Sequence, residues 1–360
     1  MQPLGGEAAL PDTPPGYRIS QPLYVSPTRL VYRAIRQQDQ QLVVLKMLGP
    51  MASEPVERAR CQQEYDITRR LDAPGIIIAY GLERWDNTLA LVLEDFGGTS
   101  LDRWLKKWRH AGAEAFPLAR FLGLASQIAA TLASIHAAGV IHKDINPSNI
   151  VFNPDTGVLK LIDFGLATTL SRETPPSRTT ALLEGTLAYL SPEQTGRMNR
   201  TVDYRTDFYS LGVTFYELLT GQLPFAAADP LEWVHAHLAK TPLAPRLLNP
   251  AIPSVVSDLV LKLLAKAPED RYQSARGLQH DLETCLQSWQ RQGQIPAFAL
   301  GQRDRAEHFL IPEKLYGRAR EVETLLAAFE RAAQGHAELL LVTGFSGIGK
   351  TAVIHEIHKP

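Results

Sequence analysis

Three side chains with oxygen donors stand in two short segments of the chain, VIHKDINPSNIVF and LKLIDFGLA. Asp144 offers a carboxylate, Asn149 offers an amide oxygen, and Asp163 offers a second carboxylate. Oxygen ligands of this kind suit Mg²⁺, and a further carboxylate can orient a hydroxyl group for attack on phosphorus. The set therefore suits a reaction in which a hydroxyl meets a phosphate that is held by a metal ion.

A second phosphate-binding pattern stands in GFSGIGKT, after the predicted strand ELLLVTG and before AVIHEIH, which can be helical. In this context the backbone between Gly344 and Gly349 would cradle phosphates at a helix N-terminus. Lys350 would reach the β- and γ-oxygens, and Thr351 would ligate Mg²⁺. The alternative interpretation is a Gly-rich surface turn.

The segments around Asp144 and Asp163 resemble the catalytic loop and the metal-binding segment of eukaryotic-type serine/threonine protein kinases. The resemblance implies that Asp144 orients the acceptor hydroxyl and that Asn149 and Asp163 hold Mg²⁺. Further motifs, GTLAYLSPEQ, TDFYSLG and KAPEDRYQS, follow in the family's order. The resemblance therefore covers residues 17–289 and implies a bilobal α+β fold.

The resemblance also implies roles for charged residues on either side of this segment. VVLK resembles the strand-borne lysine motif of the family, so Lys46 would hold the α- and β-phosphates and Glu64 would pair with it. Asp207 would brace the catalytic loop, and Glu193 would pair with Arg271.

The adenine site follows from the same alignment. VYRA stands at the family's distance before Lys46, which places Val31 over the nucleotide. Leu93 would be the gatekeeper, and the backbone from Glu94 to Phe96 would meet adenine.

The sequence departs from the family in its phosphate loop. Tyr24, Ser26 and Arg29 occupy the three glycine positions, and no glycine occurs between Gly16 and Gly49. Glycine there lets backbone N–H groups approach the phosphates and lets the loop flex. Arg29 either supplies a compensating charge or is a solvated strand residue, and the second interpretation is preferred.

Two further departures lie in the catalytic loop. Lys143 stands where many kinases have an arginine that binds a phosphorylated activation loop, and lysine cannot form the same bidentate fork. Asn146 replaces the lysine that contacts the transferred phosphate in serine/threonine kinases. Loss of that cation is expected to slow the chemistry.

The elements that must position these residues follow from periodicity. Residues 1–16 form a predicted disordered tail, and 17–96 hold short β-type runs with one helix, the smaller lobe. Residues 97–289 are mainly helical and form the larger lobe, and 290–312 are a predicted linker. Residues 313–360 resemble the start of an AAA or signal-transduction ATPase, truncated soon after its P-loop and expected to be poorly packed.

Composition excludes several other classes. Apolar residues make up 45% of the 360 residues and the net charge is −1, which gives no reason to expect nucleic acid or a membrane as partner. Cys61 and Cys285 form no metal-ligand pattern and indicate a reducing cytoplasm. The apolar run from Phe121 to Ile141 contains Gln127 and many small residues, which predicts a buried core helix.

The resemblance implies an enzyme that uses ATP and Mg²⁺ to phosphorylate serine or threonine hydroxyls of protein substrates. A kinase segment followed by an ATPase entry resembles the start of large bacterial hybrid proteins, whose sensor and histidine kinase modules would be partners. The competing hypothesis is a pseudokinase that responds to nucleotide and regulates attached modules. A small-molecule kinase on the same fold is a third hypothesis.

Overall fold

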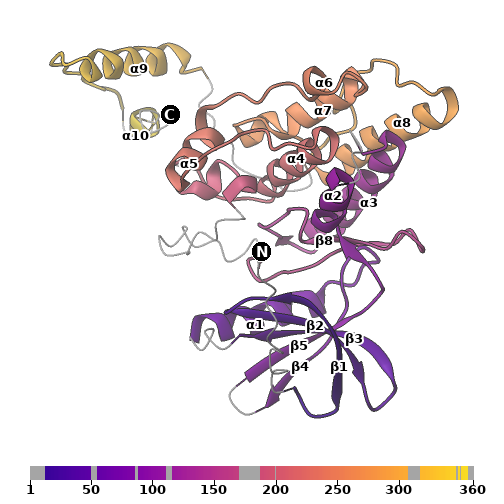
Figure 1. Ribbon diagram of the computed structural model, residues 1–360. Coiled ribbons are helices and arrows are strands. Elements are labelled where there is room, and N and C mark those ends of the chain that lie inside the picture. Colours follow the sequence, from indigo (N-terminus) through magenta and orange to yellow (C-terminus); the bar gives the residue numbers. More distant parts are fainter. Residues whose placement is uncertain are drawn as a thin grey trace, which may run out of the picture. The chain divides into compact units, whose positions relative to one another are not determined.

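The structure, a computed structural model, describes residues 13–49, 55–85, 88–110, 116–169, 187–198, 200–306, 317–345, 348 and 350–355 (Figure 1). The chain divides into two compact units. The first contains the residues up to Ser100 together with Ile150–Ala167, and the second contains Leu101–Asn149 and the residues from Thr168 onward.

The first unit is built on a five-stranded antiparallel sheet with the order β1-β2-β3-β5-β4. Its strands are β1 (Tyr17–Val25), β2 (Arg29–Arg36), β3 (Gln41–Leu48), β4 (Ala79–Trp85) and β5 (Thr88–Glu94). Burial alternates along β2 and β3, so that Leu30, Ala34 and Leu45 are among the residues of one apolar core. The predicted antiparallel sheet is confirmed.

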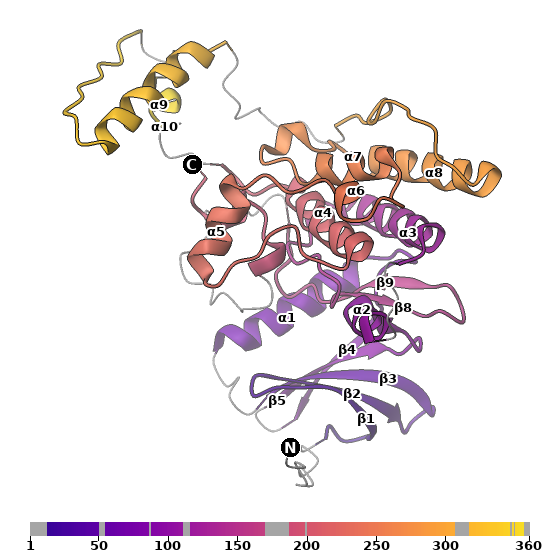
Figure 2. The same cartoon turned by 45° about the horizontal axis from the view of Figure 1, so that its top comes forward.

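One helix, α1 (Pro55–Arg70), contacts β4 and β5 and lies along the sheet in Figure 2. The helix buries Cys61, Glu64, Ile67 and Thr68, which recur at three- and four-residue spacing. This face carries a carboxylate, Glu64, into the interior of the unit, where only 4% of the residue is exposed.

A second, three-stranded sheet joins the first unit from a distant part of the sequence. It pairs β6 (Thr99–Ser100), β8 (Ile150–Phe152) and β9 (Leu159–Leu161), and Leu161 also bridges to Ile76. Residues 150–167 therefore belong to the first unit and not to the larger lobe, for which the sequence predicted residues 97–289. Local periodicity does not show which distant segment a short strand will pair with.

The second unit is mainly helical, as expected. Its helices are α2 (Leu101–His110), α3 (Leu118–Ala137), α4 (Arg205–Thr220), α5 (Pro230–Ala239), α6 (Pro245–Leu248), α7 (Ser254–Leu263) and α8 (Ala275–Gln292). A short pair, β7 (Val140–Ile141) with β10 (Thr168–Thr169), accompanies them. Helix α3 lies beside α8 in Figures 1 and 2 and also contacts α4.

Among the described helices, α3 alone has the length and hydropathy that a membrane span would need. Its buried residues include Phe121, Leu122, Ile128 and Leu132, and Phe121 packs edge-on against Phe215 of α4. The prediction of a core helix in this apolar run is confirmed.

The predicted linker, 290–312, begins inside α8, which ends at Gln292. The segment that follows is attached to the helical unit, because Asp304 accepts hydrogen bonds from Gln273 N at 2.7 Å and from Ser274 Oγ at 2.8 Å. Gly277 allows this approach, since a Cβ there would lie 2.4 Å from Asp304 Oδ1.

Two further helices, α9 (Ala319–Ala333) and α10 (Lys350–His355), contact each other. The helix predicted before the P-loop is confirmed as α9. The strand predicted in ELLLVTG is wrong, because residues 336–345 form no strand and Leu339 and Leu341 are 95% and 82% exposed. A strand needs a neighbour to receive its backbone hydrogen bonds, and the described residues offer none here.

Candidate active site

Four charged side chains converge in the first unit. Lys46 Nζ donates to both carboxylate oxygens of Glu64, at 2.6 and 2.7 Å, and lies 2.9 Å from Asp163 Oδ1. Arg29 Nη1 donates to the other oxygen of Asp163 at 2.7 Å. The predicted pairing of Lys46 with Glu64 is present, and two cations balance two carboxylates.

The register of the sheet places these groups. Lys46 lies on β3 opposite Val31 of β2, and Leu93 of β5 lies opposite Val44. Asp163 follows β9 with a φ of 66°, a left-handed conformation that is strained for a residue with a side chain. The NH of Gly165 donates to Asp163 Oδ1 at 3.3 Å and helps to hold the carboxylate in this position.

Burial and charge act in opposite directions on the two carboxyl groups. Burial would raise the pKa of Asp163, but Lys46 and Arg29 outweigh it and hold the pKa well below its ordinary value. Burial raises the pKa of Glu64, although Lys46 opposes this change. Asp163 is thus the more firmly ionised of the two, which suits a ligand of a cation.

The contact of Arg29 corrects the preferred sequence interpretation. Arg29 was expected to be a solvated strand residue, yet its guanidinium is ion-paired with Asp163, and that carboxylate raises the pKa of Arg29. Spacing along β2 could place Arg29 near the phosphate loop but could not show a partner 134 residues away.

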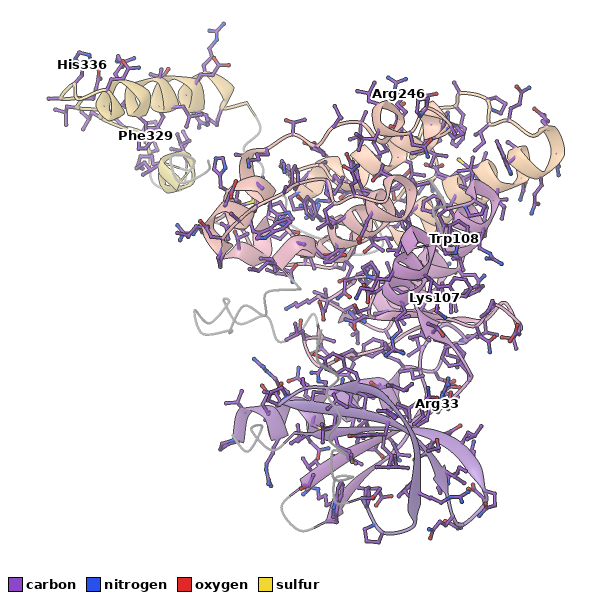
Figure 3. All side chains as sticks on the ribbon, viewed as in Figure 1. Arg33, Lys107, Trp108, Arg246, Phe329 and His336 are labelled. Carbon is purple, nitrogen blue, oxygen red and sulfur yellow. The ribbon has the colours of Figure 1, made fainter. Side chains whose placement is uncertain are left out.

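The segment expected to meet adenine is held by side chains of the same unit. Glu94 ends β5, is ion-paired with Lys160 and accepts from Ile78 N at 2.7 Å. Arg33, labelled in Figure 3, donates from β2 to Asp95 through Nε at 2.7 Å and Nη2 at 3.3 Å. The side chains of both Glu94 and Asp95 are therefore held by neighbouring residues of the sheet unit.

The backbone of Phe96 is also engaged, because its carbonyl accepts a hydrogen bond from Asn153 Nδ2 at 2.6 Å. Gly98 packs so closely that a Cβ there would lie 2.5 Å from Val151 Cγ1. Gly97 and Gly98 therefore stand in a tightly packed connection.

In the second unit, the carboxylate of Asp144 is held on both oxygens. Asn146 Nδ2 donates to Oδ1 at 2.9 Å, and Asn149 Nδ2 donates to Oδ2 at 2.8 Å. From the sequence, Asn146 marks only the absence of a cation, whereas in the structure its amide orients Asp144. The two-residue spacing was the available signal, since an Asn side chain commonly bonds the backbone or a side chain within two residues.

Asp207 braces this loop from α4, as the resemblance implied. Its oxygens accept from the backbone N–H groups of His142 and Lys143 at 3.0 and 2.8 Å, and His136 Nε2 lies 2.8 Å away. Burial would raise the pKa of Asp207, but the hydrogen bond and charge of His136 lower it overall. Lys143 adopts a φ of 65°, so the brace holds a strained turn.

The predicted pair of Glu193 and Arg271 is also present. Arg271 Nη1 and Nη2 donate to the two oxygens of Glu193 at 2.6 and 2.8 Å, and Arg271 Nε donates to the carbonyl of Ala265. Both side chains are buried. A bidentate, fully enclosed pair fixes the turn before α8 to the segment before α4.

The P-loop segment is described in part. Lys350 begins α10, and its Nζ donates to the carbonyls of Gly344 and Phe345 at 2.9 and 2.8 Å. Thr351 lies in α10, and Gly349 lies outside the described residues. Lys350 is thus bonded to the backbone of the first two residues of the GFSGIGKT motif.

An antiparallel sheet with one helix that pairs a lysine with a glutamate, and a helical unit with an aspartate loop braced from α4, define the protein kinase class of phosphotransferases. The chain belongs to that family, since the family model described as "Protein kinase domain" matches residues 28–282. The predicted family and bilobal α+β fold are confirmed. A second model, "AAA ATPase domain", matches residues 314–360.

Curated relatives agree with this assignment. The chain is 41% identical over 194 residues to hybrid signal transduction histidine kinase G of Dictyostelium discoideum, which covers 48% of the chain and 6% of that protein. It is 32% identical over 257 residues to serine/threonine-protein kinase PksC of Streptomyces coelicolor, covering 70% and 45%. It is 34% identical over 228 residues to serine/threonine-protein kinase PrkC of Bacillus subtilis, covering 63% and 34%. The chain thus spans less than half the length of each of these relatives.

Proposed function

We propose that the chain is a protein kinase that transfers the γ-phosphoryl group of ATP to serine or threonine hydroxyls of proteins. The observation that carries the proposal is the bonding of Lys46 to both oxygens of the buried Glu64. A buried carboxylate that fixes a lysine in this way gives a cation of defined position for the phosphates of a nucleotide. The names of the relatives PksC and PrkC support the serine/threonine assignment.

The donor set fits Mg²⁺ when the ion arrives with a polyphosphate. In the sheet unit Asp163 would contribute a carboxylate that stays ionised, which suits this metal. Asn149, in the helical unit, is the amide ligand that the resemblance to the family implies. Because Lys46 and Arg29 already occupy the oxygens of Asp163, a dication alone would meet two cations. Phosphate oxygens would offer those cations new partners and leave Asp163 for the metal, whose role is to neutralise charge on the phosphates.

The acceptor hydroxyl would be oriented by Asp144. The amides of Asn146 and Asn149 hold the two oxygens of its carboxylate, which restricts rotation and presents a fixed acceptor for the hydroxyl proton. Asn146 would therefore improve the position of Asp144 while supplying no charge to the transferred phosphate. We expect slower transfer than in a kinase with lysine at this position.

The test is incorporation of labelled γ-phosphate into a generic protein substrate, followed by phosphoamino-acid analysis. Asp144→Asn keeps the shape of the side chain and removes the carboxylate, so labelling should fall about 10²- to 10⁴-fold. Asp155→Asn removes the same charge from the exposed turn after β8 and is the matched control, expected to label like the natural sequence. Equal labelling by the Asp144 variant would show that the assignment is wrong.

A pseudokinase scaffold is the second candidate, and the ion pair between Arg29 and Asp163 is the observation that favours it. If Arg29 remained on Asp163 permanently, the carboxylate would be closed to Mg²⁺. A protein whose melting temperature rises with ATP but which labels no substrate would belong to this class, because a ligand that binds the folded state stabilises it.

The proposal includes a signalling role in the cytoplasm, with protein substrates and with sensor or histidine kinase modules as partners. Likeness to a hybrid histidine kinase and the match of residues 314–360 to an ATPase model support a multi-module setting. Cys61 and Cys285 are buried free thiols, and cysteines that are not joined in disulfides suit a reducing compartment.

A further inference from the structure

Both oxygens of Asp163 are occupied by cations from the sheet. Lys46 Nζ lies 2.9 Å from Oδ1, and Arg29 Nη1 lies 2.7 Å from Oδ2. Asp163, the candidate metal ligand, is therefore paired with two cations. Lys46 is also held by Glu64, whereas the described contacts of the Arg29 guanidinium lead to Asp163.

The backbone beneath Arg29 is fixed. Ser26 and Arg29 close a turn with reciprocal bonds, in which Ser26 N donates to Arg29 O at 2.9 Å and Arg29 N donates to Ser26 Oγ at 3.0 Å. Gly49 N donates to Thr28 O at 2.9 Å, and a Cβ on Gly49 would lie 2.4 Å from Pro27 O. This close approach holds the turn against the end of β3. A glycine-rich loop adapts by moving its backbone, but this turn can adapt only through side chains.

The side chain of Arg29 is suited to such movement. It is 41% exposed, compared with 12% for Lys46, so water can solvate the guanidinium when it leaves Asp163. A partly exposed ion pair is weak and exchanges readily. Two cations and two carboxylates balance each other in the observed arrangement, and a polyphosphate would add negative charge that attracts Arg29 away.

We propose that Arg29 is an exchangeable guard of the metal-binding carboxylate and a positioning residue for the nucleotide. In the nucleotide-free protein its guanidinium pairs with Asp163. When nucleotide binds without Mg²⁺, the guanidinium is shared between Asp163 and the phosphate oxygens, and binding of Mg²⁺ to Asp163 leaves it on the phosphates alone. The exchange replaces one ion pair by another, so no covalent bond changes. This inference rests on the proposed kinase function. Arg29, at the third glycine position of the phosphate loop, would contact phosphate through its side chain, which the backbone of this turn cannot do.

Binding of adenylyl-imidodiphosphate, a non-hydrolysable ATP analogue, to the full chain tests the exchange. Calorimetric titrations are made without Mg²⁺ and across a range of Mg²⁺ concentrations, for the natural chain, Arg29→Ala and Arg29→Gln. Loss of Arg29 should weaken Mg²⁺-free binding roughly three- to tenfold, because a charge-assisted contact with phosphate is lost. The Mg²⁺ midpoint, which is the Mg²⁺ concentration that gives half of the full change in affinity for the analogue, should fall about two- to fivefold. The reason is that Arg29 no longer competes for Asp163.

Arg36→Ala is the matched control. Arg36 also lies on β2 and also pairs with an aspartate, Asp39, at 2.6 Å, but on the hairpin that connects β2 to β3. Its variant should keep both the Mg²⁺-free affinity and the Mg²⁺ midpoint of the natural chain. Thermal unfolding of every variant establishes that each is folded before its binding is compared.

Two changes together identify Arg29 as a guard of Asp163: its variants bind the analogue more weakly without Mg²⁺, and they need less Mg²⁺ to reach the midpoint. If both Arg29 variants fold and keep the natural Mg²⁺ midpoint, Arg29 only braces the strand and the inference is overturned while the kinase proposal stands. If the natural chain binds no analogue with Mg²⁺, both are overturned. A labelling assay that fails although the Mg²⁺ midpoint shifts as described would overturn the kinase proposal alone.

Discussion

Two arginine–carboxylate pairs, one in each unit, differ mainly in their exposure to water. Arg271 and Glu193 in the helical unit are 0% and 1% exposed, and their contact is bidentate. Arg29 and Asp163 in the sheet unit are 41% and 16% exposed, and a single nitrogen makes the contact. The first pair joins distant segments of one unit, and the second covers a carboxylate that the proposed chemistry needs.

The difference shows how the surroundings of an ion pair decide what it can do. Breaking a buried pair leaves an uncompensated charge in a medium that cannot solvate it, so the pair stays formed as long as the unit is folded. When Arg29 leaves Asp163, water solvates the partly exposed guanidinium and Lys46 still pairs with the carboxylate, so the net change in free energy is small. We therefore assign a structural role to Arg271 and an exchangeable role to Arg29.

The largest effect is expected from breaking the buried pair. Arg271→Ala removes the partner of Glu193 and should lower the free energy of unfolding by about 3–5 kcal/mol, since Glu193 is left buried and unpaired. Chemical denaturation monitored by circular dichroism measures this change. Arg291→Ala, on an exposed position near the end of α8, is the control and should change stability little. A loss below about 1 kcal/mol for Arg271→Ala would show that this buried pair contributes no more to stability than an exposed ion pair.

A buried histidine of the helical unit, His237, should make the stability of that unit depend on pH. Tyr209 OH donates to His237 Nδ1 at 3.0 Å, and His237 Nε2 donates to the carbonyl of Leu187 at 2.9 Å. Burial lowers the pKa of His237 to about 4, and the nearby charge of Lys266 acts in the same direction. The neutral ring therefore holds the segment that precedes Ser191 in place.

The sign of the pH dependence follows from this lowered pKa. Between its unfolded value near 6.5 and about 4, the unfolded chain binds a proton at His237 that the folded chain does not, so stability falls as the pH falls. The free energy of unfolding should drop by about 2 kcal/mol from this residue between pH 7 and pH 5. His237→Gln should flatten that part of the curve. An unchanged slope in a folded variant would show that His237 does not titrate as described.

The smallest effect is expected from the exposed pair. Arg29→Ala in the nucleotide-free chain should change the free energy of unfolding by less than about 1 kcal/mol, because Lys46 continues to pair with Asp163. Denaturation in the absence of nucleotide measures this change. A loss as large as that of Arg271→Ala would mean that Arg29 is a structural brace and would remove the contrast between the two regions.

Motif order predicted the parts of the site that are reached through regular elements. Lys46 on β3 and Glu64 on α1 meet because a strand and a helix each project residues at fixed spacing, and Asp207 reaches the catalytic loop from the first turn of α4. These contacts depend on the fold of the family, which the motifs identify. A sequence that carries the motifs in order therefore also specifies the contacts.

The contacts that the sequence did not predict depend on side chains that depart from the family pattern. Arg29 reaches Asp163, and Asn146 bonds Asp144, through rotamers that no pattern of spacing encodes. Pairing between distant short strands was missed for a similar reason, as with Leu161 beside Ile76. In ELLLVTG the apolar run suggested a strand, but an apolar run forms a strand only where a neighbouring backbone is available.

A crystal structure of the full chain with Mg²⁺ and adenylyl-imidodiphosphate tests the contrast between the two pairs most directly. We expect Arg29 Nη1 to move beyond about 4 Å from Asp163 Oδ2 and to contact phosphate oxygens, while Arg271 keeps both bonds to Glu193. A nucleotide complex in which Arg29 still bonds to Asp163 would contradict it.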